Sequence, residues 1–228
     1  MIVINPIGGL CNYLRVIFSY YRMAVEKNEK LVVIWRQTDV CTGFFLDYFH
    51  PVEGIEFISH NINNYKHDYR GCYPHANYAP DYTKLKVLEK IKSIILIKQQ
   101  ELEYNYIAVH IRRTDFIPSA ISRNVYVSDE DFCRFIDKNL IKNLYIATDN
   151  KETYDTFKSK YNSYIPFNYH NTLIGVRRHT SLEDSIIDLY MCVYALEFMG
   201  SKHSSFSDLI NALRELEVSP ILKYLLSD

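Results

Sequence analysis

The sequence has almost no net charge, because 26 Lys and Arg residues are balanced by 27 Asp and Glu residues, giving a formal charge of -1. Such a chain has no overall attraction to nucleic acid or to an anionic membrane surface. We therefore expect no nucleic-acid partner, and any functional positive charge must be concentrated locally.

Cysteine pairs and long apolar runs are also missing. The five cysteines are odd in number, widely spaced and without a C-x-x-C pair, which argues against a disulfide framework or a zinc site and indicates reduced thiols. No run approaches the roughly 18 apolar residues that a membrane span needs. The amino terminus carries no basic leader or cleavage site. We therefore expect a soluble, cytoplasmic protein without a membrane span.

The usual phosphate-binding glycine motifs are absent as well. The chain contains neither G-x-G-x-x-G nor G-K-[ST], which excludes a dinucleotide fingerprint and a P-loop. What remains is Gly8-Gly9, followed by Asn12, between a predicted strand and a predicted helix. Glycines at such a turn permit positive φ and a close backbone approach to an anion at the helix start. A simple tight turn explains them equally well, and Asn12 is open to interpretation as a helix cap.

The hydrophobic pattern predicts an α/β protein. At 228 residues, 48% hydrophobic and 23% charged, the composition is that of an ordinary globular chain of one or two domains. Short apolar runs predict strands, and apolar residues at three- and four-residue steps predict helices between them. The polar stretch 59–82 is expected to be a loop facing the acceptor. Expected strands are 1–5, 31–35, 55–58, 104–108, 144–147, 164–165 and 198–201; expected helices are 14–25, 44–49, 84–100, 128–137, one through Phe157, 181–197 and 204–216.

The stretch 109–115 is the centre of the functional argument. A buried strand runs directly into His110, Arg112, Arg113 and Asp115. Ligand sites in open α/β sheets lie beyond the carboxyl ends of strands. An arginine there offers a fork of donors that matches a phosphate bidentately. The alternative is a pair of surface arginines neutralised by Asp115.

Polar residues follow other predicted elements in the same way. Thr148 and Asp149 end a strand, and Ser204, Ser205 and Ser207 open a helix whose free N–H groups suit an anion. Asp129-x-Asp131 matches the D-x-D motif of metal-dependent sugar transferases, but Ser128 is a good N-cap and acidic residues favour a first helical turn, so we interpret this segment as a helix start. No metal site is predicted. Convergence of several anion-binding elements favours a ligand site over a surface salt bridge.

Together these residues resemble the ordered motifs of GDP-fucose-dependent fucosyltransferases. The similarity is greatest to the α1,6-fucosyltransferases, including the nodulation enzymes, and weaker to α1,2- and protein O-fucosyltransferases. The matching motifs are Gly8-Gly9-Leu10-x-Asn12, His110-x-Arg112-Arg113-x-Asp115, Thr148-Asp149 and Gly200-Ser201-x-x-Ser204-Ser205-Phe206-Ser207.

The resemblance implies a GT-B-like fold with two Rossmann-like halves facing a cleft. We place the acceptor-side half at 1–103 and the donor-binding half at 104–228. The implied function is inverting transfer of fucose from GDP-fucose to a glycan or other hydroxyl acceptor, without cofactor or metal. The alternatives are transfer from another GDP-sugar and a non-catalytic nucleotide-sugar-binding homologue.

The resemblance also implies roles for individual residues. Arg112 would hold the β-phosphate and stabilise the leaving diphosphate, while Asp188 or Asp184 would pair with guanine. Asp115 is a candidate catalytic carboxylate on a different ground, because it is the carboxylate nearest in sequence to the arginine motif. The donor-binding set is Gly8, Gly9, Asn12, His110, Arg112, Arg113, Thr148, Asp149, Asp184, Asp188, Ser204, Ser205, Phe206 and Ser207.

Two departures from the family pattern concern the turn and the base. Cys11 stands where the family usually has another glycine, and 116–124 contains no carboxylate to match the family's base. Asp115 is then either the base or a structural partner of Arg113 or of backbone N–H groups. Asp39 is a second candidate base, and a third possibility is late proton transfer without a strong base. Acceptor, linkage and oligomeric state are not predicted.

Overall fold

The computed structural model describes residues 1–60, 68–69, 78–140, 142–161 and 180–225. The chain divides into two compact units, Met1–Ile91 with Glu215–Asp228, and Lys92–Arg214. Each unit contains one parallel sheet, which confirms the predicted α/β class. The predicted division at residues 103 and 104, and the GT-B arrangement of two halves, stay predictions.

The sheet of the first unit has the strand order β3-β2-β1-β4. It is formed by β1 (Ile2–Pro6), β2 (Leu31–Ile34), β3 (Ile55–Ile58) and β4 (Asp68–Tyr69). Helix α1 (Leu10–Glu26) buries its apolar face, and the ring of Tyr13 lies edge-on to Trp35 with centroids 4.8 Å apart. Trp35 is fully buried and donates its indole N–H to the carbonyl of Gly43 (2.7 Å), so this large side chain anchors the core.

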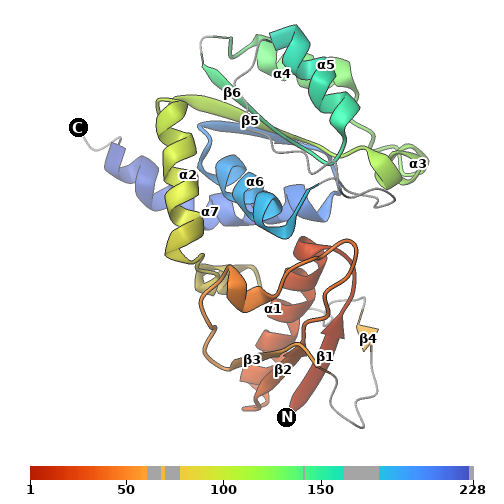
Figure 1. Cartoon of the computed structure of the whole chain (residues 1–228), viewed down its shortest axis with the longest axis vertical. Helices are drawn as coiled ribbons and strands as arrows, with labels where there is room; N and C mark the ends of the chain where they lie inside the picture. Colours follow the sequence, from red (N-terminus) through yellow and green to blue (C-terminus); the bar gives the residue numbers. More distant parts are fainter. Residues whose placement is uncertain (61–67, 70–77, 141, 162–179, 226–228) are drawn as a thin grey trace. The chain divides into compact units, whose positions relative to one another are not determined.

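The sheet of the second unit has the order β6-β5-β7, with β5 (Tyr106–Ile111) in the centre, β6 (Asn143–Thr148) and β7 (Glu197–Gly200). Helices α4 (Asp129–Asp137) and α5 (Lys151–Tyr161) lie on one face of this sheet, and α6 (Leu182–Tyr194) lies on the other (Figure 1). Alternate β5 residues Ile107, Val109 and Ile111 pack in a core with Phe132 and Phe157. All six residues of β5 are buried, as expected for the central strand of a covered parallel sheet.

The remaining described elements are short or connect the two units. They are the 3₁₀ turns η1 (Phe45–Asp47), η2 (Ala79–Lys84) and η3 (Thr114–Phe116), the short helix α3 (Ile117–Ser122), and the helices α2 (Glu89–Glu101) and α7 (Ser205–Leu225). The boundary between the units falls within α2 and again within α7.

Several predicted boundaries are wrong, with identifiable reasons. The helix predicted over 84–100 begins only at Glu89, because the backbone of 86–88 bonds to 48–50, with His50 donating to Lys86 and Leu88 to Tyr48. The helix predicted over 181–197 ends at Tyr194, since Leu196 donates to the carbonyl of Tyr106 and Glu197 begins β7.

Other differences extend or shorten elements. The strand predicted over 104–108 runs from Tyr106 to Ile111, so His110 lies within β5 and not beyond it. The segment 44–49 forms a single 3₁₀ turn, and the last helix continues past residue 216 to Leu225. The strand predicted over 55–58 is confirmed without change. The predicted strand 164–165 lies outside the described residues.

Candidate functional site

His110, on β5, lies against the start of α7. Its Nδ1 is 2.8 Å from the hydroxyl oxygen of Ser207, and its ring stacks on Phe206 with centroids 4.6 Å apart. The backbone N–H of Ser201 donates to the carbonyl of His110 (3.0 Å), which holds the end of β7 beside β5. The structure therefore brings together three residues of the predicted donor set.

Arg112 leaves the carboxyl end of β5 with a nearly buried side chain that is 11% exposed. Its guanidinium forms ion pairs with Asp149 and Asp115, one through each terminal nitrogen. Its backbone N–H donates to the hydroxyl of Ser201 (2.9 Å). The guanidinium is held at two points and the backbone at a third, so the position of the charge is fixed in advance, as an electrostatic site requires.

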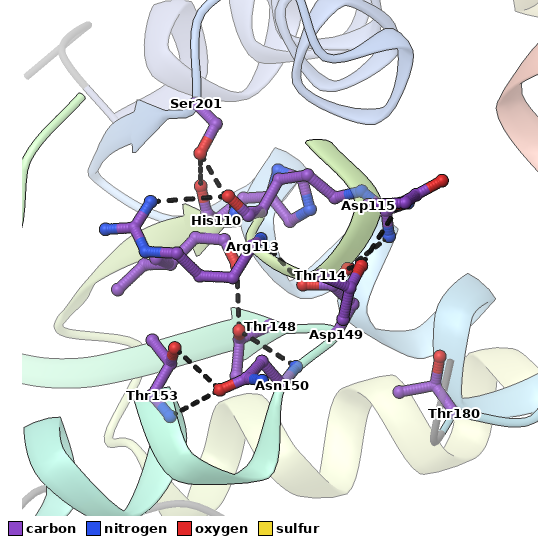
Figure 2. A network of polar contacts seen from close by, with 12 residues as sticks. His110, Arg113, Thr114, Asp115, Thr148, Asp149, Asn150, Thr153, Thr180 and Ser201 are labelled. Carbon is purple, nitrogen blue, oxygen red and sulfur yellow. Dashed lines mark hydrogen bonds and ion pairs between the residues drawn. The ribbon is translucent and has the colours of Figure 1, made fainter. Parts of the chain in front are cut away.

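Asp149, directly after β6, is the acceptor at the centre of this arrangement. One carboxylate oxygen accepts from Arg112 and from the hydroxyl of Thr114, and the other accepts from the backbone N–H of Arg113 (2.9 Å). Figure 2 shows Asp149 and Thr114 side by side within this polar network. Thr114 has a φ of 30°, in the left-handed region, which turns the chain sharply after the strand. Asp149 thus supports the segment Arg112-Arg113-Thr114, which we call the arginine loop.

Arg113 points to a different set of partners. Its guanidinium pairs with Asp129 at the start of α4 and lies 5.2 Å from the centroid of the Tyr126 ring and 5.7 Å from that of Phe132. Arg113 therefore braces the loop against an acid, but that acid is Asp129 and not Asp115, which pairs with Arg112. Arg113 anchors the loop to α4 through charge and aromatic contact.

The D-x-D segment behaves as a helix start, as predicted. Ser128 is the N-cap of α4 and accepts from the backbone N–H of Asp131, which accepts in return from the Ser128 N–H (3.0 Å). The Asp131 carboxylate accepts from the Ser128 N–H and from the Ser128 hydroxyl (2.9 Å), and these two bonds lower the pKa of Asp131. Among the described residues, no group of three His, Cys, Asp or Glu side chains is arranged to hold a metal ion.

Thr148 and the serines shape the edge of the sheet. The Thr148 hydroxyl donates to the carbonyl of Ile111 (2.7 Å). It accepts from the backbone N–H of Asn150 (3.3 Å), a contact drawn in Figure 2. Ser204 and Ser207 are buried, while Ser205 is half-buried. The helix α7 begins at Ser205, so its first N–H groups lie beside His110, in the position predicted for a phosphate-binding helix start.

Asp188 is buried in the middle of α6 and accepts a hydrogen bond from the hydroxyl of Tyr145 (2.6 Å). Burial is the main cause that raises the pKa of Asp188 to about 7; the Tyr145 bond and the charge of Lys98 lower it, and Asp184 raises it. The Asp184 backbone N–H donates to the hydroxyl of Ser181 (3.0 Å), the N-cap of α6. The guanine-pairing role predicted for Asp188 or Asp184 stays a prediction.

The glycine loop lies in the first unit. Gly8 has a φ of 108°, and an added Cβ would lie 2.9 Å from the side-chain nitrogen of Asn12. Gly9 is the N-cap of α1, so the alternative that Asn12 caps this helix is wrong. The prediction that Gly8, Gly9 and Asn12 join the donor site stays a prediction.

Residues that the sequence argument left out of the site include Thr114, Ser201 and Asp129. Ser201 lies in the Gly200-Ser201 motif, which was a usable signal, because Ser201 holds the backbone of Arg112. No sequence pattern pointed to Thr114, because its hydrogen bond to Asp149 depends on the sharp turn after β5.

The fold is similar to solved structures of the NodZ α-1,6-fucosyltransferase. A structure soaked with GDP-fucose has 14% identity and a TM-score of 0.63, covering 93% of this chain and 92% of that chain. A structure co-crystallised with GDP has a TM-score of 0.59 at 14% identity, covering 92% and 91%. The Bradyrhizobium enzyme with selenomethionine gives a TM-score of 0.64 at 14% identity, again covering 92% and 91%. No protein-family model matches the chain, and no curated protein matches its sequence.

Proposed function

We propose that this chain is a glycosyltransferase that transfers fucose from GDP-fucose to a hydroxyl acceptor with inversion, without a metal ion. The observation that carries the proposal is the held position of Arg112 at the end of β5, next to the start of α7. The likeness in fold to NodZ structures prepared with GDP and with GDP-fucose supports this choice of donor.

Arg112 suits the leaving group of such a reaction. A guanidinium has five N–H donors and keeps its charge at any working pH, and the two ion pairs of Arg112 use one contact from each terminal nitrogen. As the bond between the sugar and the diphosphate breaks, negative charge grows on the β-phosphate, and a fixed cation stabilises that charge more in the transition state than before it. The hydroxyl groups and N–H groups at the start of α7 add donors for the same diphosphate.

The proposal is tested by thermal unfolding with GDP, UDP and GDP plus EDTA. A ligand at 100 times its dissociation constant adds about 2.7 kcal/mol to the free energy of unfolding. We expect stabilisation by GDP that EDTA does not remove. Greater stabilisation by UDP, or loss of the GDP effect in EDTA, would contradict the proposal.

A second candidate is a nucleotide-sugar-binding protein without transferase activity. It is favoured by one observation, the lack of any Asp or Glu in 116–124 to serve as acceptor base. Release of GDP from GDP-fucose over hours, compared with a blank and with GDP-mannose, separates the candidates. Binding of GDP-fucose without any turnover would favour the non-catalytic protein. Turnover of GDP-mannose alone would mean that the transferred sugar is mannose and not fucose.

The prediction that the chain has no membrane span can be compared with the helices of the structure. Searched over the residues that the structure describes, no helix is long and apolar enough to cross a bilayer.

A further inference from the structure

Residues of helices α4 and α5 line an open pocket of about 410 Å³ in the second unit. Its walls include Cys133, Phe157 and Lys160, together with the charged side chains of the first two turns of α4. Figure 1 shows the two helices adjacent to each other. None of these three residues belongs to the donor site proposed above.

Cys133 differs from the other described cysteines. It is partly exposed, whereas Cys11, Cys41 and Cys192 are buried, and Cys72 lies outside the described residues. The ammonium of the exposed Lys160 donates to the Cys133 sulfur (3.0 Å). This contact is the main cause that raises the pKa of Lys160. An accessible thiol beside an ammonium group has the environment of an oxidant-sensitive cysteine.

Tyr161 completes the surroundings of the sulfur. Its hydroxyl lies against Cys133 and donates to Asp137 (3.0 Å). Burial, followed by the contacts with Cys133 and Asp137, raises the pKa of Tyr161, so the phenol keeps its proton. The sulfur therefore faces one proton donor from α5, the Lys160 ammonium, because the Tyr161 proton is directed to Asp137.

We propose that Cys133 and Lys160 form a peroxide-sensitive site at which one oxygen atom joins the sulfur of Cys133 to the side-chain nitrogen of Lys160. The product is a reversible covalent bridge between α4 and α5. The co-reactant is a hydroperoxide such as hydrogen peroxide, which is small enough to reach the sulfur through the pocket.

The first step gives a sulfenic acid. The thiolate of Cys133 attacks one peroxide oxygen, the O–O bond breaks, and the Lys160 ammonium protonates the leaving hydroxide to give water. Sulfur loses two electrons and the first peroxide gains them. Lys160 is left as a neutral amine next to the sulfenic acid, which is the protonation state that a new N–O bond needs.

The second step forms the bridge. A second peroxide takes two electrons and two protons, one proton from the sulfenic hydroxyl and one from the amine, and becomes two water molecules. The N–O bond forms while the S–O bond of the sulfenic acid is retained. Two molecules of a dithiol reductant, each supplying two electrons and two protons as it forms a disulfide, return the thiol, the amine and one water.

The bridge would tie the first half of α4 to the end of α5. Asp129, which pairs with Arg113, also lines the pocket, so the same helix supports the arginine loop. The bridge itself depends only on the geometry of Cys133 and Lys160, and it does not rest on the proposed glycosyl transfer.

The test is peptide mass mapping after treatment of the whole chain with hydrogen peroxide. We expect a cross-linked pair of peptides containing Cys133 and Lys160, heavier than their sum by one oxygen atom and lighter by two hydrogen atoms. Dithiothreitol should restore the two separate peptides. A rise in the melting temperature that the reductant reverses should accompany the cross-link.

Three variants make the test specific. Cys133→Ser should form no bridge, and Lys160→Arg should stop at the sulfenic acid, which dimedone traps. Lys158 is exposed on the same helix, and Lys158→Arg should form the bridge as the parent chain does. The proposal is overturned if peroxide takes Cys133 to sulfinic acid with Lys160 unmodified, or if Lys160→Arg and the parent chain give the same products.

Discussion

At the scale of the residue, Arg112 is paired with one buried carboxylate and one exposed carboxylate. Asp149 is nearly buried, and its two oxygens accept from three donors of the arginine loop. Asp115 is half exposed, and it accepts from Arg112 and from the hydroxyl of Thr114 (3.1 Å). The two carboxylates on the same guanidinium should therefore respond differently to substitution.

Arg112→Lys is expected to abolish most turnover while the fold survives. Lysine keeps the charge but cannot contact Asp149 and a phosphate through one planar fork. Loss of a single fixed donor to a developing anion costs about 10²–10³ in rate. Donor hydrolysis and transfer assays measure the effect, and Arg134→Lys is the matched control because Arg134 pairs with Asp131 at the surface. If Arg112→Lys keeps the rates of the parent chain, the role of Arg112 is limited to its structural ion pairs.

Asp149→Asn is expected to destabilise the chain and to weaken GDP binding together. An amide has one acceptor oxygen in place of two and leaves the nearly buried Arg112 with less compensation, so a loss of about 3 kcal/mol is expected. Urea unfolding measures this loss. Asp155→Asn, in an exposed pair with Lys151, should cost less than about 1 kcal/mol. Equal losses in the free energy of unfolding for the two variants would show that Asp149 does not support the arginine loop.

Asp115→Asn is expected to lose transfer without losing the fold. The Asp115 side chain is 47% exposed, so its pair with Arg112 adds little stability, and a missing general base lowers rate by about 10²–10⁴. The comparison is with Asp39→Asn, measured by acceptor transfer, GDP binding and melting temperature. A fall in melting temperature that matches the loss of transfer would make Asp115 structural. Normal transfer in both variants would favour late proton transfer without a strong base.

At the scale of the element, the junction from β7 to α7 depends on one glycine. A Cβ added to Gly200 would lie 2.5 Å from the hydroxyl oxygen and 2.7 Å from the Cβ of Ser207. This close approach lets the start of α7 lie against the end of β7, and it places Ser207 next to His110. The glycine therefore determines the geometry of a predicted ligand-binding segment.

Gly200→Ala is expected to destabilise the chain by about 1–3 kcal/mol, because the new methyl group forces Ser207 to move. Ser207→Ala removes the bond to His110 without a clash and should cost about 1 kcal/mol. Urea unfolding of both variants is compared with that of Gly200→Ala combined with Ser207→Gly. The double variant should recover part of the loss, because it removes the Ser207 contacts and leaves the Phe198 ring 2.9 Å from the methyl group. No loss of stability in Gly200→Ala would contradict the close contact.

Sequence reasoning succeeded where the pattern was local. The apolar run at 55–58 and the Ser128 cap need only neighbouring residues, and both are confirmed. It failed at residues 85–88 and 195–197, where helical periodicity was overridden by backbone bonds to distant strands and turns. Likewise Asp149 could be placed at a strand end from sequence, but its three donors come from a loop more than thirty residues earlier in the chain.

At the scale of the whole molecule, two parallel sheets in separate compact units agree with the α/β prediction, and the fold likeness to NodZ covers nearly the full length. The apolar strands fix the class of the fold because a parallel sheet needs cover on both faces. The same covering has a cost in the second unit, where Asp188 of α6 is enclosed beside Tyr145 of β6.

This enclosed carboxyl group should make global stability depend on pH. The pKa of Asp188 is about 7 in the folded chain, mainly because burial disfavours the charged form, against 3.8 ordinarily. Between these values the folded state binds a proton that the unfolded state releases. The contribution of Asp188 is thus fully present below about pH 4 and is lost as the pH rises to about 7.

Asp188→Asn should remove this part of the pH dependence. The amide is neutral at every pH and can still accept a hydrogen bond from the Tyr145 hydroxyl. As the pH rises from 4 to 7, the free energy of unfolding of the parent chain should therefore fall relative to that of the variant. Tyr145→Phe removes a hydrogen bond that lowers the pKa of Asp188, and its loss of stability should extend to higher pH. Urea titrations at a series of pH values measure both effects, with Asp155→Asn as the exposed control. Parallel pH profiles for Asp188→Asn and the parent chain would show that Asp188 ionises in the folded state as it does in the unfolded state.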